Sequence, residues 1–230
     1  IVRLLLNSQR GGVVRLLLGF LDDPQAPLVI FKVLAERKDI KFVEHFLRTV
    51  GSKPTRAVTQ SLGRLEKIAW LTPGSDLLDK LDDEYHEVVV QVALASGLKH
   101  DERFQILAHM LTHGKAPGRR AAAEALQNFK GAEADSLIIK SLNDEDPYVR
   151  AHLIRQLRPR QIPNALLFLI RMVGTTDEAI REALRESMPE FSFRNFLKNL
   201  DAMEEELRPM TGHLVRQIDP GCAANVKAEM

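Results

Sequence analysis

Apolar residues recur along the chain with a period close to 31 residues. One series marks the expected ends of alternate helices, with gaps of 30 or 31: Val50, Leu81, Leu111, Leu142, Val173 and Met203. A second series has gaps of 31 or 32: Leu62, Leu94, Leu126, Leu157 and Met188. Two interleaved series with one period predict two helices in every repeat.

The spacing inside each repeat is helical. In the segment that contains Ile106, Leu107, Met110 and Leu111, apolar residues recur at three and four positions, which places them on one face of a helix. No segment needs a strand. Proline, glycine and aspartate gather between the helical segments, at 23–24, 51–54, 72–75, 116–118, 146–147 and 174–177. Residues of these types end one helix and cap the next.

These signals predict an all-α fold, a right-handed α-solenoid or superhelix of about six helical hairpins. Two short helices cannot bury their apolar faces alone, so neighbouring hairpins must stack. The expected hairpins are 24–50, 75–98, 102–130, 132–160, 163–189 and 192–218, with a further helix in 54–71.

We expect the whole chain, 1–230, to be one repeat domain. Residues 1–22 are interpreted as the remnant of a preceding repeat, because an amphipathic pattern is already under way at Ile1. The chain is accordingly expected to be a fragment of a longer polypeptide. The phenylalanine-rich segment 191–218 is expected to be an atypical capping hairpin, and 219–230 a tail.

The segment 144–150, Asp-Glu-Asp-Pro-Tyr-Val-Arg, resembles the HEAT-repeat family, in which an aspartate opens the second helix and Val-Arg follows four residues later. The segment 177–184 is similar, and one repeat earlier the arginine is kept but lysine replaces the acid. In that family the aspartate and arginine form a ladder between neighbouring repeats. The resemblance therefore implies structural roles for Asp146, Arg150, Asp177, Arg181 and Arg119.

Composition narrows the possible partners. The 230 residues are 45% apolar, and 32 lysines and arginines balance 31 acids, so the chain lacks the strongly basic character of most duplex-DNA binders. The sole cysteine, Cys222, excludes an internal disulfide. Because no apolar run is long enough to cross a membrane, we expect a soluble, cytoplasmic protein without a membrane partner.

The candidate catalytic and metal-binding residues are few. His109 and His113 lie four apart on one predicted helix and can share a face, but the glutamate of a zincin motif is missing. We interpret both as polar positions on a solvated helix face. Cys222 has no histidine near it in the sequence, and the scattered glycines form no phosphate loop. We therefore expect no catalytic residue, no metal and no cofactor.

Three enzyme classes with HEAT-like folds are alternatives. The pair His86-Glu87 resembles one of the several His-Glu pairs that hold iron in deoxyhypusine hydroxylases, but the matching positions one and two repeats later are Gly118-Arg119 and Val149-Arg150. HEAT-like DNA glycosylases hold a base against exposed aromatics, whereas the only tryptophan, Trp70, is expected in the core. Phycobilisome lyase-like proteins share only the repeat length.

One basic cluster stands out. No acid occurs from 147 to 176, and Arg155, Arg158 and Arg160 fall near the end of one predicted helix. They are either a patch for an acidic peptide or phosphate, or cations that complement the helix dipole. One repeat away on either side, the positions that match Arg155 are Glu124 and Glu186, so no basic stripe forms and a nucleic acid is disfavoured. We therefore predict a non-catalytic scaffold that binds a partner protein or peptide on its concave surface.

Overall fold

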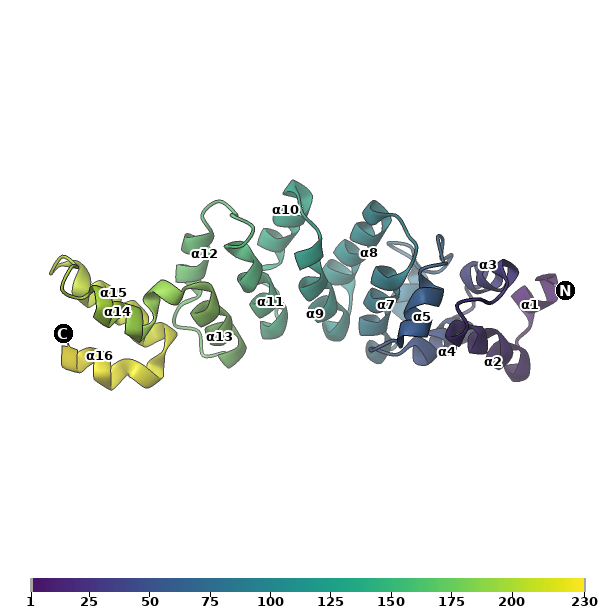
Figure 1. Ribbon diagram of the computed structural model, residues 1–230, viewed down its shortest axis with the longest axis horizontal. Helices are drawn as coiled ribbons and strands as arrows, with labels where there is room; N and C mark the ends of the chain where they lie inside the picture. Colours follow the sequence, from purple (N-terminus) through teal and green to yellow (C-terminus); the bar gives the residue numbers. More distant parts are fainter. Residues whose placement is uncertain (1, 230) are drawn as a thin grey trace. The chain divides into compact units, whose positions relative to one another are not determined.

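The computed structural model describes residues 2–229, and all regular structure in this part of the chain is helical (Figure 1). This confirms the predicted all-α class. The period predicted one domain over 1–230, and the chain divides into two compact units, Ile1–Phe129 and Lys130–Met230. None of the helices in the described range is both long enough and apolar enough to cross a membrane.

The elements of the first unit follow one another as short helices. They are α1 (Val2–Asn7), α2 (Gly11–Gly19), η1 (Phe20–Asp22), α3 (Leu28–Glu36), α4 (Ile40–Val50), α5 (Arg56–Leu62), α6 (Asp76–Lys80), α7 (Asp83–Ala95), α8 (His100–His113), α9 (Ala116–Ala125) and η2 (Leu126–Asn128). Helix α7 packs against α4, α8 and α9, and forms the centre of this unit.

Side-chain caps fix some of the helix starts in this unit. The side chain of Asp39 accepts a hydrogen bond from the N–H of Phe42 and begins α4, and Thr55 caps α5 in the same way. Such a cap satisfies one of the backbone donors that a helix leaves free at its first turn. Helices α4 and α5 are therefore stabilised in two ways, by the caps at their first turns and by burial of their apolar faces.

The first unit departs from the predicted pattern between α5 and α6. A helix was expected over 54–71, but α5 ends at Leu62 and residues 63–75 are irregular. Ile68 and Trp70 are both buried while Ala69 between them is exposed. A regular helix would turn two residues at this spacing to nearly opposite sides. Both side chains reach the core from a non-helical segment instead, in which the N–H of Leu71 donates to the carbonyl of Ile68 at 3.1 Å and closes a turn.

The second unit continues the alternation of helices. Its elements are α10 (Ala132–Ser141), α11 (Pro147–Leu157), α12 (Ala165–Met172), α13 (Glu178–Ser187), η3 (Pro189–Phe191), α14 (Phe193–Asn199), α15 (Leu207–Ile218), η4 (Pro220–Cys222) and α16 (Ala223–Glu229). Helix α11 packs on α10 and α13, and α13 packs on α15.

The 31-residue series marks the core in both units. In the first series the members up to Leu142 are buried, and in the second all but Leu94 are buried. The later members Val173 and Met203 are half-buried. The period seen in the sequence is therefore the period at which these helices present apolar residues to the interior.

The segment 219–230, expected to be a tail, instead contains helix α16. Cys222 and Val226 are buried in one cluster with Phe196 of α14 and Val215 of α15. Burial raises the pKa of the Cys222 thiol, so the thiol behaves as a small apolar group. The C-terminal helices thus share a core of their own, and the expected capping hairpin of 191–218 has a third helix against it.

The tightest helix contact in the first unit lies between α7 and α9. A methyl group on Gly118 would lie 2.8 Å from the Cβ of His86 and 2.8 Å from the Cε of Met110. His86 is only 2% exposed. Its Nδ1 accepts the N–H of Lys115 at 3.2 Å, and its Nε2 lies 3.4 Å from the carbonyl oxygen of Leu81. Since Nδ1 accepts, the proton belongs on Nε2 and the ring is neutral.

Gly118→Ala is expected to lower the free energy of unfolding by about 1–3 kcal/mol, because the added methyl collides with the Cβ of His86. Alanine otherwise favours a helix by about 1 kcal/mol over glycine. Gly12→Ala, in α2, is the matched control because nothing lies within 4 Å of the added methyl. Urea denaturation measures both, and a Gly118→Ala protein as stable as Gly12→Ala would contradict the close contact.

The stability of the first unit is expected to fall as the pH falls below 6.5, the ordinary pKa of histidine. Burial lowers the pKa of His86, so the unfolded chain takes up a proton at a higher pH than the folded chain does. The stabilisation is complete above pH 6.5 and is lost as the pH falls towards the folded pKa. Urea denaturation between about pH 5 and pH 8 gives the free energy of unfolding of the wild type and of His86→Asn. The difference between the two free energies at each pH isolates the contribution of His86. Parallel curves would contradict it.

Candidate functional site

The three arginines of the predicted basic patch already hold carboxylates within the second unit. Arg155 of α11 pairs with Glu186 of α13, and both are partly exposed, at 35% and 50% of the side chain. The Nη1 of Arg158 lies 2.7 Å from the Oε1 of Glu190 and also donates to the carbonyl of Ser187 at 2.8 Å. These contacts join one hairpin to the next and neutralise the charge of both arginines.

Arg160 lies in the turn after α11 and makes a similar pair. Its Nη1 lies 2.8 Å from the Oδ1 of Asp135, in the first turn of α10, and only 10% of the Arg160 side chain is exposed. The three guanidinium groups therefore point to carboxylates of three different elements and do not form a common anion site.

The first of these pairs, Arg155 with Glu186, could have been predicted from the sequence. Arg155 and Glu186 lie 31 residues apart, which is the repeat period. Residues one period apart occupy equivalent places on neighbouring hairpins, so opposite charges there can meet. The alternation of sign was interpreted only as evidence against a basic stripe. It also predicts ion pairs between hairpins.

Arg155→Glu is expected to destabilise the chain by no more than about 1 kcal/mol, because exposed ion pairs contribute little. The swap Arg155→Glu/Glu186→Arg restores opposite charges one period apart. It should recover most of the loss in a double-mutant cycle measured by urea denaturation. Additive effects of the two single substitutions would contradict direct pairing.

The ladder residues lie at helix starts and between hairpins. The Nη2 of Arg150 donates to the Oδ2 of Asp177 at 3.2 Å and links α11 to the start of α13. Asp146 caps α11, accepting the N–H of Tyr148 at 2.9 Å. Arg181 instead pairs with Glu178 on its own helix.

The preceding arginine of the ladder series makes a local contact in the first unit. Arg119 donates to the carbonyl of Gly114 at 3.2 Å, which supports the turn between α8 and α9. Of the three arginines in the series, Arg150 donates to the aspartate of the following hairpin, Asp177. That bond is one rung of the kind implied by the resemblance.

His109 and His113 lie together on α8 with their rings stacked, the centroids 4.9 Å apart and the planes 18° from parallel. Burial, and then the neighbouring His113, lowers the pKa of His109. Nitrogen lone pairs lie in the ring plane, so two parallel rings do not converge on one ion. Within residues 2–229, no group of three or more His, Cys, Asp or Glu side chains is placed to hold a metal.

The residues of the enzyme alternatives serve structural contacts. Both ring nitrogens of His86 face protein groups, which leaves neither for an iron ion. Trp70 is 1% exposed and packs edge-on against Phe46 with the ring centroids 6.0 Å apart. A buried indole cannot stack on a nucleic-acid base, so this tryptophan has the core position that the sequence predicted.

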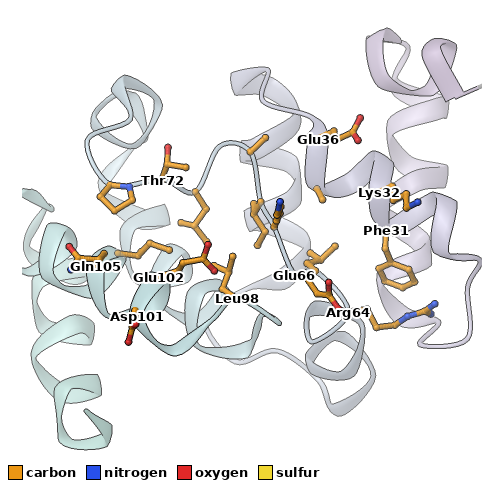
Figure 2. A pocket seen from close by; sticks show the side chains of 18 of the residues that line it. Phe31, Lys32, Glu36, Arg64, Glu66, Thr72, Leu98, Asp101, Glu102 and Gln105 are labelled. Carbon is orange, nitrogen blue, oxygen red and sulfur yellow. The ribbon is translucent and has the colours of Figure 1, made fainter. Parts of the chain in front are cut away.

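A hollow in the first unit lies beside the irregular segment, between α3 and α8. We call it the α3–α8 groove; it has a volume of about 1120 Å³. Its lining comes from three parts of the chain: 28–36 of α3, 64–73 of the irregular segment, and 98–106 at the start of α8. Figure 2 shows Lys32 and Glu36 on the α3 side, and Glu102 and Gln105 on the α8 side.

Two backbone hydrogen bonds hold the irregular segment between these helices. The N–H of Ala69 donates to the carbonyl of Ala35 at 2.7 Å, at the end of α3. The N–H of Gly97 donates to the carbonyl of Leu65 at 3.1 Å, in the turn before α8. A methyl on Gly97 would lie 2.5 Å from the carbonyl oxygen of Gly63, so this approach requires glycine. The groove is therefore preformed by the backbone.

The floor of the groove is apolar and its rim is charged. Leu65, Ile68, Leu71, Leu98 and Ile106 line it and are mostly buried, while Leu28 at one edge is 66% exposed. Pockets of this kind, apolar with a few polar groups at the edge, are typical of binding sites. Because a helix was predicted over 54–71, the groove could not be foreseen from the sequence.

Arg64 also lines the groove, but its charge is engaged. Its guanidinium lies 4.1 Å from the centroid of the Phe31 ring and donates to the carbonyl of Ala26 at 2.8 Å. It also donates to the carbonyl of Pro24. Figure 2 shows Arg64 beside Phe31 at one edge of the groove. Arg64 is thus part of the wall, where it ties the irregular segment to the start of α3.

Compared with protein-family models, with curated proteins and with solved structures, the chain has no match in any of the three. Its class therefore rests on the fold: an all-α protein of short helices, with a long irregular segment at 63–75 in the first unit.

Proposed function

We propose that the chain is a HEAT-like repeat scaffold, a right-handed α-solenoid without catalytic activity, that binds a segment of a partner protein in the α3–α8 groove. The observation that carries this proposal is the groove itself. Its apolar floor, charged rim and fixed backbone have the properties of a peptide-binding groove between helices.

Support for the repeat assignment comes from the second unit. The bond between Arg150 and Asp177 joins α11 to the start of α13, as expected of a HEAT ladder. The pair of Arg155 and Glu186 adds a second link one period apart. Because Arg155, Arg158 and Arg160 of the predicted patch are all paired with carboxylates, the groove of the first unit is the better candidate for the partner site.

The volume of the groove also favours a protein segment over a small molecule as its occupant. A volume of about 1120 Å³ lies just above the range for small-molecule pockets, which is about 300–1000 Å³. Helices line two of its sides, as in the grooves that receive short peptide segments. A scaffold of this class needs no catalytic group, and its specificity comes from the exposed side chains around the groove.

Blocking the groove tests this function. Ala69 lines it, is exposed, and keeps its backbone bond to Ala35 when its side chain is changed. Ala69→Phe is therefore expected to fill the groove. The variant should no longer retain the partner proteins that the wild-type chain retains from a lysate of the cells that produce the chain. Quantitative mass spectrometry of the retained proteins measures this loss.

The matched control is Ala202→Phe, an equally large addition at an exposed position of the second unit. Both variants keep Trp70 as the only tryptophan, so its emission reports whether the first unit remains folded. The proposal predicts partners lost with Ala69→Phe and kept with Ala202→Phe. Identical partner sets for folded forms of both variants would contradict it.

A further inference from the structure

We infer that the occupant of the α3–α8 groove is a basic segment of a protein, in which aliphatic side chains alternate with lysines or arginines. This inference rests on the proposed function, because it names the chemistry of the partner that the groove receives. It is carried by the apolar floor of the groove and by the sign and position of the charges around it.

The α8 side of the rim is acidic. Asp101 and Glu102 both line the groove and are exposed, and Gln105 follows one turn later on the same wall. Figure 2 shows Asp101, Glu102 and Gln105 together on α8. The backbone N–H of Lys99 donates to Glu102 at 2.9 Å, so Glu102 also caps the helix. This wall presents carboxylates and an amide, but no cation, to an occupant.

The remaining rim does not cancel this charge. On the α3 side Lys32 and Glu36 offer one charge of each sign, and on the irregular segment Glu66 and Lys67 do the same. All four are exposed. Among the side chains that line the groove, the acids are thus Glu36, Glu66, Asp101 and Glu102 and the lysines are Lys32 and Lys67. Arg64 is held by two carbonyls and the Phe31 ring.

Charge complementarity follows from this arrangement. Four acids against two lysines leave an excess of two negative charges, or of one if Arg64 is included. A partner with lysines or arginines on both sides of its apolar anchors pairs with the excess acids, whereas an acidic peptide or a phosphate backbone meets repulsion. The apolar anchors take the floor, where Leu65, Ile68 and Leu71 lie.

Three fluorescein-labelled peptides of about a dozen residues, with the same leucine positions, test the inference by fluorescence anisotropy. The polar positions carry lysine in the first, glutamate in the second and glutamine in the third. On the full chain the lysine peptide is expected to bind about fivefold to twentyfold more tightly than the glutamine peptide, with the glutamate peptide weakest. Added salt should reduce the preference.

The decisive variant is Glu66→Lys/Asp101→Lys, which reverses two exposed charges of the rim and leaves the cap of Glu102 in place. It should make the glutamate peptide the preferred one. Glu205→Lys/Glu206→Lys is the control, since it makes the same change of charge at exposed positions outside the groove. The control should keep the preference for lysine.

Several results would overturn the inference. They are equal affinity for the three peptides, tighter binding of the glutamate peptide or of a single-stranded oligonucleotide to the wild type, or an unchanged preference in the Glu66→Lys/Asp101→Lys variant. If Ala69→Phe still removes partners from the lysate in such a case, the proposed function stands and only the basic nature of the partner is wrong. If Ala69→Phe removes none, the proposed function fails as well.

Discussion

The structure depends on one constraint, which is that a helix of about ten residues cannot bury its apolar face without a neighbour. Each helix therefore needs a partner in its own hairpin and another in the next. In the first unit α7 meets both needs, packing on α8 and on its neighbours α4 and α9. In the second unit α11 has the same position between α10 and α13. The period of about 31 residues is the distance along the sequence between equivalent buried positions of successive helix pairs.

The α3–α8 groove lies beside a segment that buries its apolar side chains without forming a helix. Between α5 and α6 the chain is irregular, and Trp70 enters the core against Phe46 in place of a helix face. Loss of a buried aromatic side chain costs about 3–5 kcal/mol, a large part of the stability of an ordinary domain. The buried indole thus anchors this irregular segment to the core of the first unit. The hollow between α3 and α8 lies beside the segment.

Much of the helical order could be predicted from the sequence, because periodicity and caps act locally. Pro147 after Asp146, for example, marks the start of α11. The irregular segment was missed because its apolar residues were interpreted with helical spacing, although Ile68 and Trp70 are buried on either side of an exposed Ala69. The helix in 223–229 was missed because so short a segment carries little periodic signal, and its formation depends on burial of Val226.

The candidate site was harder to predict than the fold. A cluster of arginines is visible in the sequence, but the carboxylates that neutralise it come from elements tens of residues away, as with Arg158 and Glu190. A groove lined by three separate segments has no linear signature at all. The charges on its rim become neighbours only in the fold, where α3, the irregular segment and α8 lie together.

The most direct measurement is the methyl NMR spectrum of the chain with and without the lysine peptide. The account predicts shift changes at Leu28, Leu98 and Ile106, whose methyl groups line the α3–α8 groove. Leu166 and Leu167 of α12 are exposed apolar residues in the second unit, and their signals should not move. Changes confined to these two leucines, with none in the groove, would contradict the account.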